Sequence, residues 1–212
     1  MTHPHLRARL IAALLPIAAL LALLAPAPAR RALAQETPNP DTVTIPGTIQ
    51  SQLGCPGDWQ PDCAKTFLTY DESSGIWQGQ FDLPAGAYEY KVALNQSWDE
   101  NYGLNAKRGG ANIPLTLAQP ASVIFRYDHR THWVADSIGA PIATVVGSFQ
   151  SEIGCADDNT PGCLGAWLQD PDGDGSFALV TTKIPAGTYD ARVAIGSTLD
   201  EVYGADGAKG GP

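Results

Sequence analysis

The sequence contains little charge, and basic residues in particular are few. Of its 212 residues, 13 are Lys or Arg and 22 are Asp or Glu, which gives a formal net charge of -9. A chain with this excess of acid neutralises phosphates poorly, so a nucleic-acid partner is not expected. The length leaves little room for a complete (β/α)₈ barrel, which typically needs about 250 residues, and allows one or two domains.

No apolar run is long enough to span a membrane comfortably. The longest, Leu10–Ala25, has 16 residues, whereas a spanning helix needs roughly 20. Arg7 and Arg9 precede the run, and the small-x-small site Ala32-Leu33-Ala34 follows it. The pattern predicts a secretory signal peptide over residues 1–34, cleaved after Ala34. We therefore expect a secreted, extracellular protein without a stable membrane anchor.

Cleavage would make the protein more acidic. Residues 1–34 hold four arginines and no acidic residue, so the mature chain keeps 9 of the 13 basic residues and all 22 acidic ones, a net charge of -13. Residues 35–42 are polar and rich in proline. This composition predicts a disordered leader ahead of the folded part.

The strongest pattern in the chain is an internal repeat. Gly47–Cys55 matches Gly147–Cys155 at an offset of 100, and Cys63 matches Cys163. After a one-residue insertion the offset is 101, and the matches there pair Pro84-Ala85-Gly86 with Pro185-Ala186-Gly187, Asp99-Glu100 with Asp200-Glu201 and Tyr102-Gly103 with Tyr203-Gly204. Solenoid repeats are 20–50 residues long, so this period is that of a domain. We predict a first module at 43–136, a linker at 137–141 and a second module at 142–212.

The second module is predicted to be incomplete. Gly211 aligns with Gly110, so residues 111–136 of the first module have no counterpart. That segment holds two of the best strand patterns of the first module. Without them a module would expose its core and a long sheet edge. We expect the chain to be the N-terminal piece of a longer protein; the alternative is a second module completed by a strand from another chain.

Each module is predicted to be all-β. Short alternating runs are separated by turn residues, and in Val123–Asp128 every second residue is apolar, so one face of a strand is buried. Asp71–Gly75 predicts a hairpin turn, and Pro84-Ala85-Gly86 predicts a turn in which Gly86 is free to adopt positive φ. About seven strands in about 95 residues favour an immunoglobulin-like β-sandwich, truncated in the second module before its last two strands. The strands expected in the first module are Val43–Gln50, Thr66–Tyr70, Ile76–Leu83, Ala87–Leu94, Ile113–Leu117, Ser122–Tyr127 and Thr131–Ala135.

The four cysteines form two pairs with the same spacing, Cys55 with Cys63 and Cys155 with Cys163. An oxidising exterior favours disulfides, and the loop-entropy model gives about 2.5 kcal/mol for closing a loop of this size. The alternative is a metal site, but Cys-x₇-Cys is not a zinc spacing and no histidine lies nearby. We predict two local disulfides.

Few residues could carry catalysis. The adjacent carboxylates Asp99 and Glu100 recur as Asp200 and Glu201. A glycosidase needs two carboxylates that face one bond about 5–9 Å apart, whereas neighbours on a strand point to opposite faces, so hydrogen bonds to loop amides are favoured. The sequence has no Gly-x-Ser-x-Gly, His-Glu-x-x-His or phosphate loop. We predict a noncatalytic chain without a cofactor.

No metal site is predicted. The two mature histidines, His129 and His132, flank a tight turn, and a solvated turn is favoured over metal binding. Residues Asp170–Gly175 resemble the start of a calcium loop, but an EF-hand needs Glu at the twelfth position, where this chain has Thr181. A simple turn is therefore favoured there too.

Aromatic residues offer a ligand-binding alternative, because they bury the apolar faces of sugar rings while polar neighbours bond the hydroxyls. Trp77 and Trp133 lie in strand patterns, which favours the core. Trp59 and Trp98 lie in loops, where ligand contact and packing both stay open. The second module has Asn159 and Leu199 instead, so it should bind weakly or not at all. The carbohydrate-binding candidates are Trp59, Asn95, Trp98, Asp99, Glu100 and Tyr102.

Several segments together resemble the amylopullulanase X-twenty-five module family. They are Leu53-Gly54-Cys55 through Cys63, Leu83–Val92, Asn95–Gly103, Gly110–Leu115 and Tyr127–Trp133. The resemblance covers 42–136 and most of 141–212; the second module departs most, with Gly196 in place of Asn95 and no Trp98 equivalent. It implies tandem noncatalytic β-sandwich modules attached to secreted bacterial pullulanases and related α-glucan hydrolases.

Two functions follow as expectations. The first is an α-glucan-associated accessory module, with starch or pullulan as partner and a catalytic domain downstream in the parent protein. The alternative is a rigid spacer or stability module without a carbohydrate ligand.

Overall fold

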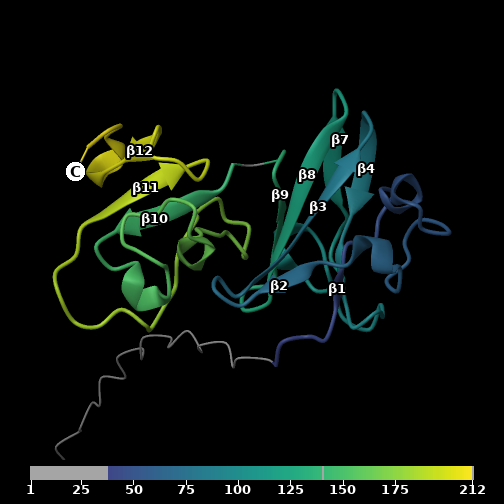
Figure 1. The fold of residues 1–212 in the computed structure, drawn as a ribbon, viewed down its shortest axis with the longest axis horizontal. Coiled ribbons are helices and arrows are strands. Elements are labelled where there is room, and N and C mark those ends of the chain that lie inside the picture. The colour runs from purple at the N-terminus through teal and green to yellow at the C-terminus, as the bar shows by residue number, and fades with distance from the viewer. Residues whose placement is uncertain (1–37, 140, 212) are drawn as a thin grey trace, which may run out of the picture. The chain divides into compact units, whose positions relative to one another are not determined.

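The computed structural model describes residues 38–139 and 141–211, and these belong to one compact unit. Within them all strand pairs are antiparallel and the helical elements are short 3₁₀ turns, so the all-β prediction is confirmed (Figure 1). No helix in this part of the chain is both long and apolar enough to cross a membrane. The predicted signal peptide and the start of the predicted leader lie outside the described residues.

The first module contains three sheets. One has the order β1 (Val43–Thr44), β5 (Val92–Leu94), β6 (Asn101–Tyr102); the second has β2 (Thr69–Asp71), β3 (Ile76–Leu83), β8 (Ala121–Asp128), β9 (Trp133–Asp136); the third pairs β4 (Gly86–Tyr90) with β7 (Ile113–Leu117). The 3₁₀ turns are η1 (Gln50–Leu53), η2 (Ala64–Thr66) and η3 (Leu104–Ala106). One apolar cluster draws residues from all three sheets, which is the packing of a β-sandwich.

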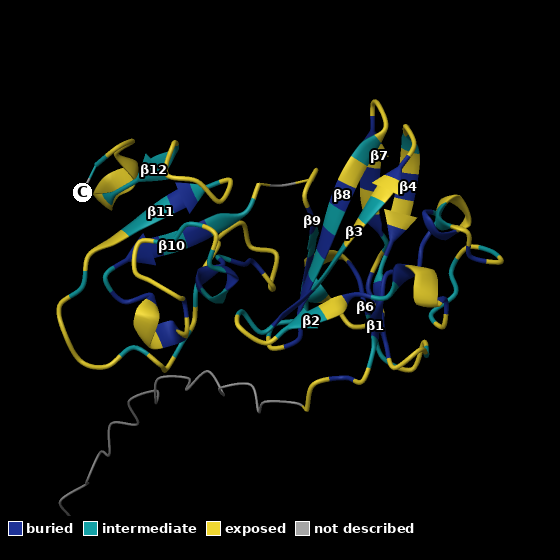
Figure 2. Ribbon diagram, viewed as in Figure 1, coloured by how far each residue is buried: buried dark blue, intermediate teal, exposed yellow. Residues whose placement is uncertain are grey.

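The core follows the alternation of the sequence. Val123, Phe125 and Tyr127 of β8 are fully buried, as the period of two predicts. Tyr90 meets Phe125 edge-on at 4.8 Å between ring centroids, and its hydroxyl donates to Asp136 Oδ2 at 2.8 Å. Trp77 is buried in the same cluster, so its predicted core role is confirmed. Figure 2 shows buried residues alternating with intermediate and exposed ones along β8.

Three strand predictions differ clearly from the structure, and the predicted strand Thr66–Tyr70 is one of them: Thr66 ends η2, and β2 begins at Thr69. The run 87–94 divides into β4 and β5 because the amide of Lys91 bonds to Pro46 O at 3.0 Å, outside either strand pair. Val43–Gln50 is a strand only at its start and continues into η1. Gly86 does not adopt the positive φ that is open to glycine; it begins β4 opposite Leu117. A Cβ there would lie 3.0 Å from the ring of Tyr88, which accounts for the glycine.

The second module has a single sheet in the described residues, with the order β10 (Ala143–Gly147), β11 (Ala191–Ile195), β12 (Val202–Tyr203). Its 3₁₀ turns are η4 (Ser151–Ile153), η5 (Leu164–Ala166) and η6 (Ala205–Gly207). These elements repeat β1, β5, β6 and the turns of the first module at the predicted offsets. The tandem-module prediction is therefore confirmed.

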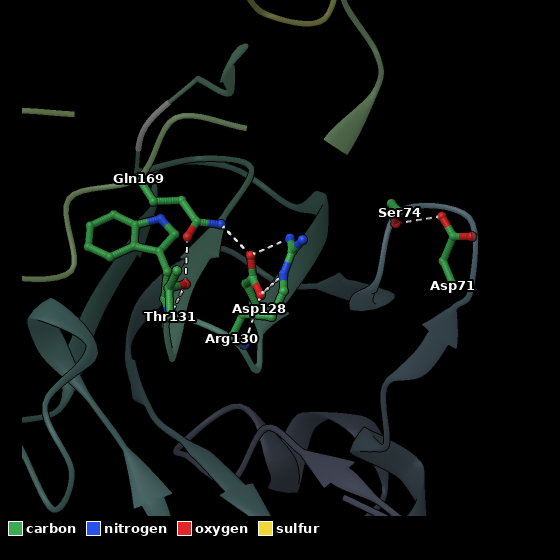
Figure 3. Close-up of polar contacts among 7 residues, drawn as sticks. Asp71, Ser74, Asp128, Arg130, Thr131 and Gln169 are labelled. Carbon is green, nitrogen blue, oxygen red and sulfur yellow. Dashed lines mark hydrogen bonds and ion pairs between the residues drawn. The ribbon is translucent and has the colours of Figure 1, made fainter. Parts of the chain in front are cut away.

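The two modules touch through a small mixed contact. Ile76, Leu164 and Trp167 are buried in one cluster, and Trp133, Ala135 and Ile142 pack against it. Gln169 adds polar bonds, since its Nε2 donates to Asp128 Oδ2 at 2.9 Å and its Oε1 accepts from Thr131 Oγ1 at 2.5 Å. Figure 3 shows Gln169 between these two side chains, with Arg130 on the same carboxylate. Trp133 thus packs at the module contact and is only half-buried.

Candidate functional site

The candidate site is built on the cysteine loop that follows η1. Cys55 is bonded to Cys63 with 6.0 Å between their Cα atoms, and Cys155 to Cys163 with 5.7 Å, so the predicted disulfides are confirmed. Each disulfide closes a short loop at the same place in its module. The loop is therefore a rigid part of the scaffold.

A buried glutamine fixes the backbone of this loop. Gln50 Oε1 accepts from the amide of Gln60 at 2.7 Å, and its Nε2 donates to Gln60 O and to Thr66 Oγ1, both at 2.8 Å. Gln150 holds Thr160 by the same pair of backbone bonds, at 2.7 and 3.0 Å. The sequence did not indicate that Gln50 is buried, because glutamine is polar. Its recurrence as Gln150 in the repeat was the one signal that could have indicated a structural role.

Within this loop, Trp59 has a backbone conformation that tryptophan rarely adopts. Its φ is +60°, in the left-handed region, and the matching residue Asn159 has φ +55°. Asn tolerates this region because its short side chain bonds locally, whereas bulky residues are outliers there. The two loops thus share one backbone conformation, which suits Asn159 and strains Trp59.

The side chain of Trp59 meets Trp98, which comes from the loop between β5 and β6. The ring centroids are 6.4 Å apart and the planes are tilted by 39°. With Lys91 and Asn112 they line a hollow of about 290 Å³, which we call the tryptophan hollow. Trp98 is 39% exposed, and Asn112 Nδ2 donates to Glu89 Oε2 at 2.9 Å. The hollow combines the rings of the exposed Trp98 and the half-buried Trp59 with an amide and an ammonium group.

Sequence reasoning missed Lys91 and Asn112. Lys91 stood in the sequence only as one of two charged residues in Leu83–Val92, with Glu89, and the sequence gave no sign that Asn112 lies close to the tryptophans. The positions of Lys91 and Asn112 depend on the pairing of β4 with β7, which a local sequence pattern does not reveal.

The other predicted binding residues do not line the hollow. Asn95 Oδ1 accepts from the amides of Asp41 and Thr42 at 2.8 and 3.4 Å, so it ties the chain before β1 to this loop. Asp99 has an exposed side chain. Glu100 accepts from the hydroxyl of Tyr102 at 2.7 Å, a phenol and not the loop amide expected, and Tyr102 itself is buried.

The histidines pack in a cluster with two tyrosines, in which His129 is buried and His132 is half-buried, so the expected solvated turn is wrong. The ring of His132 stacks on Tyr102 at 3.9 Å between centroids, and its Nδ1 lies 2.8 Å from the hydroxyl of Tyr127. Nδ1 of the buried His129 lies 3.0 Å from the same hydroxyl. That phenol has one hydrogen, so at least one of the two histidines donates to it. The pairing of β8 with β9 brings these rings together.

Burial sets the ionisation of this cluster. It raises the pKa of Tyr127 and, with the hydrogen bond to Glu100, that of Tyr102 far above the usual range of a phenol. Burial also lowers the pKa of His132, and the neighbouring His129 lowers it further. At neutral pH the two phenols therefore act as uncharged hydrogen-bonding groups.

The acidic loop of the second module has the hydrogen bonds of a turn. Asp170, Asp172 and Asp174 have carboxylate oxygens within 4.8 Å of one another. Asp170 accepts from the amides of Asp174 and Gly175 at 3.1 and 2.9 Å. Its two oxygens are used to hold the loop closed.

Comparison with known proteins gives the family. The family model Pullulanase X25 domain matches residues 42–134 and 142–210. The chain belongs to this family, a noncatalytic module of pullulanases, and the predicted resemblance is confirmed.

The chain also resembles individual proteins of that kind. It is 40% identical over 86 residues to an amylopullulanase of Thermoanaerobacterium thermosulfurigenes and 35% identical over 96 residues to one of Thermoanaerobacter thermohydrosulfuricus. These matches cover 41% and 45% of this chain but 5% and 6% of the relatives.

Two solved structures are similar in part. The pullulanase from Bacillus acidopullulyticus has 27% identity, covers 74% of this chain and 16% of its own, and gives a TM-score of 0.42. The ligand-induced structure of AmyP-SBD has 14% identity, covers 55% of this chain and 87% of its own, and gives a TM-score of 0.25.

Proposed function

We propose that this chain is an α-glucan-associated accessory module and forms the N-terminal part of a secreted glycoside hydrolase. The family and the amylopullulanase relatives support the connection with starch or pullulan. Cleavage after Ala34 would release the extracellular form, with the modules at 43–136 and 142–212. The catalytic domain would lie elsewhere in the parent protein.

The backbone of Trp59 is the observation that carries the binding proposal. A bulky residue in the left-handed region is an outlier, and such strained residues cluster at functional sites. The second module shows that Asn fits the same backbone, so the fold itself does not require Trp59. Its ring stands beside Trp98 at the tryptophan hollow, where it can stack on a ligand.

The shape of the tryptophan hollow suits a curved sugar chain. Aromatic faces bury the apolar faces of sugar rings, and the two planes here are tilted by 39°. An α-1,4-glucan curves, whereas a β-1,4-glucan is a flat ribbon that fits coplanar rings. Lys91 and Asn112 supply hydrogen-bond donors for hydroxyls at the rim. The disulfide and Gln50 hold the loop in place, which lowers the entropy cost of binding.

Native affinity electrophoresis of residues 35–212 tests this proposal. We expect gels with amylopectin or pullulan to retard the protein, and gels with a β-1,4-glucan or no polysaccharide to leave its mobility unchanged. The Trp98→Ala variant should run as in the empty gel, while Leu199→Ala, at the matching place in the second module, should be retarded like the wild type.

The module contact favours a second candidate, a rigid spacer without a sugar ligand. Its buried cluster and the bonds of Gln169 would hold the two modules at a fixed angle. Unchanged mobility in all the gels would support this candidate and contradict the first.

A further inference from the structure

Five polar contacts link the segment before β1 to the loop that carries Trp98. They run through two tyrosines, on β6 and β8, and two histidines of the turn between β8 and β9. We call this set the histidine chain, and its members in order are Pro38, His129, Tyr127, His132, Tyr102 and Glu100. The direction of each bond follows from the hydrogens that the members carry.

The direction of the chain is fixed at Pro38. A carbonyl only accepts, so Nε2 of His129, which lies 3.1 Å from Pro38 O, carries the hydrogen of that ring. Nδ1 of a neutral His129 then accepts, and the hydroxyl of Tyr127 donates to it at 3.0 Å. The single hydrogen of Tyr127 is thereby used, so Nδ1 of His132 donates to the same oxygen at 2.8 Å. The two histidines are therefore opposite tautomers.

The other end of the chain leaves one contact without a hydrogen. The hydroxyl of Tyr102 donates to Glu100 Oε1 at 2.7 Å. Nε2 of His132 is bare when Nδ1 carries the hydrogen, and it faces the same hydroxyl at 3.2 Å, the longest of the five contacts. Two neutral imidazoles and two phenols bring four hydrogens to these five contacts. One proton on His132 completes the chain.

Both ends of the histidine chain reach the loop that carries Trp98. Glu100 lies two residues after Trp98 in the sequence. The amide of Asp41, three residues after Pro38, donates to Oδ1 of Asn95 at 2.8 Å, where the loop begins. The histidine chain therefore holds the loop on both sides of Trp98.

We propose that His132 and Tyr102 are positioning residues for the tryptophan hollow, and that one proton on His132 completes the histidine chain and strengthens glucan binding. The inference rests on the proposed function. A donor on its oxygen makes the Tyr102 hydroxyl a stronger donor to Glu100, because linked hydrogen bonds polarise one another. The loop is then better ordered before the ligand arrives, which lowers the entropy cost of binding.

The surroundings of His132 set the pH at which the proton binds. The titratable and charged groups that face it are His129, Glu100, Tyr102, Arg108, Tyr127 and Asp128, the last paired with Arg130. Burial and the neighbouring histidine lower the pKa of His132 from its usual 6.5. The two carboxylates favour the charged ring, whereas the guanidinium of Arg108 opposes it. The ring is therefore neutral at pH 7.5, and the proton binds below pH 6.5.

The ¹⁵N chemical shifts of the imidazole rings test the hydrogen assignment without any ligand. His129 and His132 are the two histidines of residues 35–212. At pH 7.5 we expect His129 in the Nε2–H form and His132 in the Nδ1–H form, and on titration to pH 5.0 Nε2 of His132 should gain a hydrogen. Two Nε2–H rings at pH 7.5, or a His132 that takes up no proton by pH 5.0, would overturn the proposal.

The affinity for maltoheptaose tests the coupling to the tryptophan hollow. Isothermal titration calorimetry of residues 35–212 at pH 7.5 and 5.0 should show binding about fivefold tighter at the lower pH, the low end of ordinary coupling between two sites. Because coupling is reciprocal, saturating maltoheptaose should also raise the pKa of His132. Equal affinity at both pH values would overturn the coupling.

Tyr102→Phe isolates the hydroxyl. It keeps the ring that stacks on His132 at 3.9 Å and removes the bond to Glu100. The variant should bind with one affinity at both pH values, although His132 still titrates. Tyr203→Phe removes the matching bond to Glu201 in the second module and should keep the pH dependence of the wild type. Loss of the pH dependence in both variants, or in neither, would contradict the role of Tyr102.

Failure of this coupling and failure of glucan binding give different results. Binding that does not change with pH would overturn the coupling and leave the proposed function in place. Absence of maltoheptaose binding at both pH values, with the two rings in their expected tautomers, would overturn the proposed function and the coupling with it.

Discussion

Trp59 and Asn159 occupy the same left-handed backbone conformation at matching positions of the two modules, with φ of +60° and +55°. Asn159 of the second module fits this backbone conformation, whereas Trp59 of the first module does not. Because asparagine is enough for the fold at this position, the effect of Trp59 on ligand binding can be measured apart from its effect on stability. This difference leads directly to a substitution with opposite effects on stability and binding.

Trp59→Asn should abolish retention in amylopectin gels while leaving the melting temperature unchanged or a few degrees higher. Relief of left-handed strain, worth about 1–2 kcal/mol for an ordinary residue, offsets the lost contact with Trp98. Differential scanning calorimetry and affinity electrophoresis of the same samples check both parts. A drop of more than about 5 °C would instead assign Trp59 a packing role.

Gln50→Leu should lower stability and also weaken glucan retention, because Gln50 holds the backbone next to Trp59. Leaving its buried partners unsatisfied costs about 1–3 kcal/mol. Gln150→Leu makes the same change in the second module and should lower stability without affecting retention. Chemical denaturation and the gels measure both. Equal retention by the two variants would argue against a positioning role for Gln50.

Trp98→Ala should remove glucan retention with little change in thermal unfolding, because 39% of Trp98 is exposed. Trp77→Ala, in the buried core, is the contrast: it should cost about 3–5 kcal/mol. Melting temperatures of the two variants make the comparison. If Trp98→Ala destabilises the protein as much as Trp77→Ala, Trp98 belongs to the core.

The stability of the first module should fall on acidification through the titration of His132. Burial lowers the pKa of His132 from its usual 6.5, so the unfolded state binds its proton more readily. The contribution of His132 to the free energy of unfolding is therefore fully present above pH 6.5, and it decreases as the pH falls below that value. The groups that surround His132 are His129, Glu100, Tyr102, Tyr127, Asp128 and Arg108.

His132→Asn provides the control, because asparagine does not titrate and tolerates the φ of +60° at this position. Melting temperatures between pH 7.5 and 5.0 should fall less steeply for the variant than for the wild type. Parallel curves would show that other groups cause the acid sensitivity.

The sequence predicted those parts of the fold that depend on local patterns. The bounds of β3 and β7 match the predicted strands, and in β7 the buried apolar residues Ile113, Leu115 and Leu117 alternate without a break. The tandem modules followed from the spacing of the repeat, and the disulfides from the cysteine spacing together with the oxidising exterior expected of a secreted chain. Elements fixed by partners distant in the chain were harder: Lys91 interrupts a run that reads as one strand because its amide bonds to Pro46.

The candidate site was predicted in part for the same reason. The two loop tryptophans stood out as aromatic residues absent from the second module, and they meet at the hollow. The burial of Tyr102, His129 and His132 could not be foreseen, because polar rings read as exposed until β8, β9 and β6 bring them together. The burial of Gln50 was missed for the same reason, because its side chain is also polar.

Titration of ¹⁵N-labelled protein with maltoheptaose, followed through the indole N–H signals, tests glucan binding at the tryptophan hollow most directly. The chain has five tryptophans, so single Trp→Phe variants assign every signal. The signals of Trp59 and Trp98 should shift and saturate together, while those of Trp77, Trp133 and Trp167 stay in place. Five unchanged signals, or shifts confined to the other three, would contradict binding at this site.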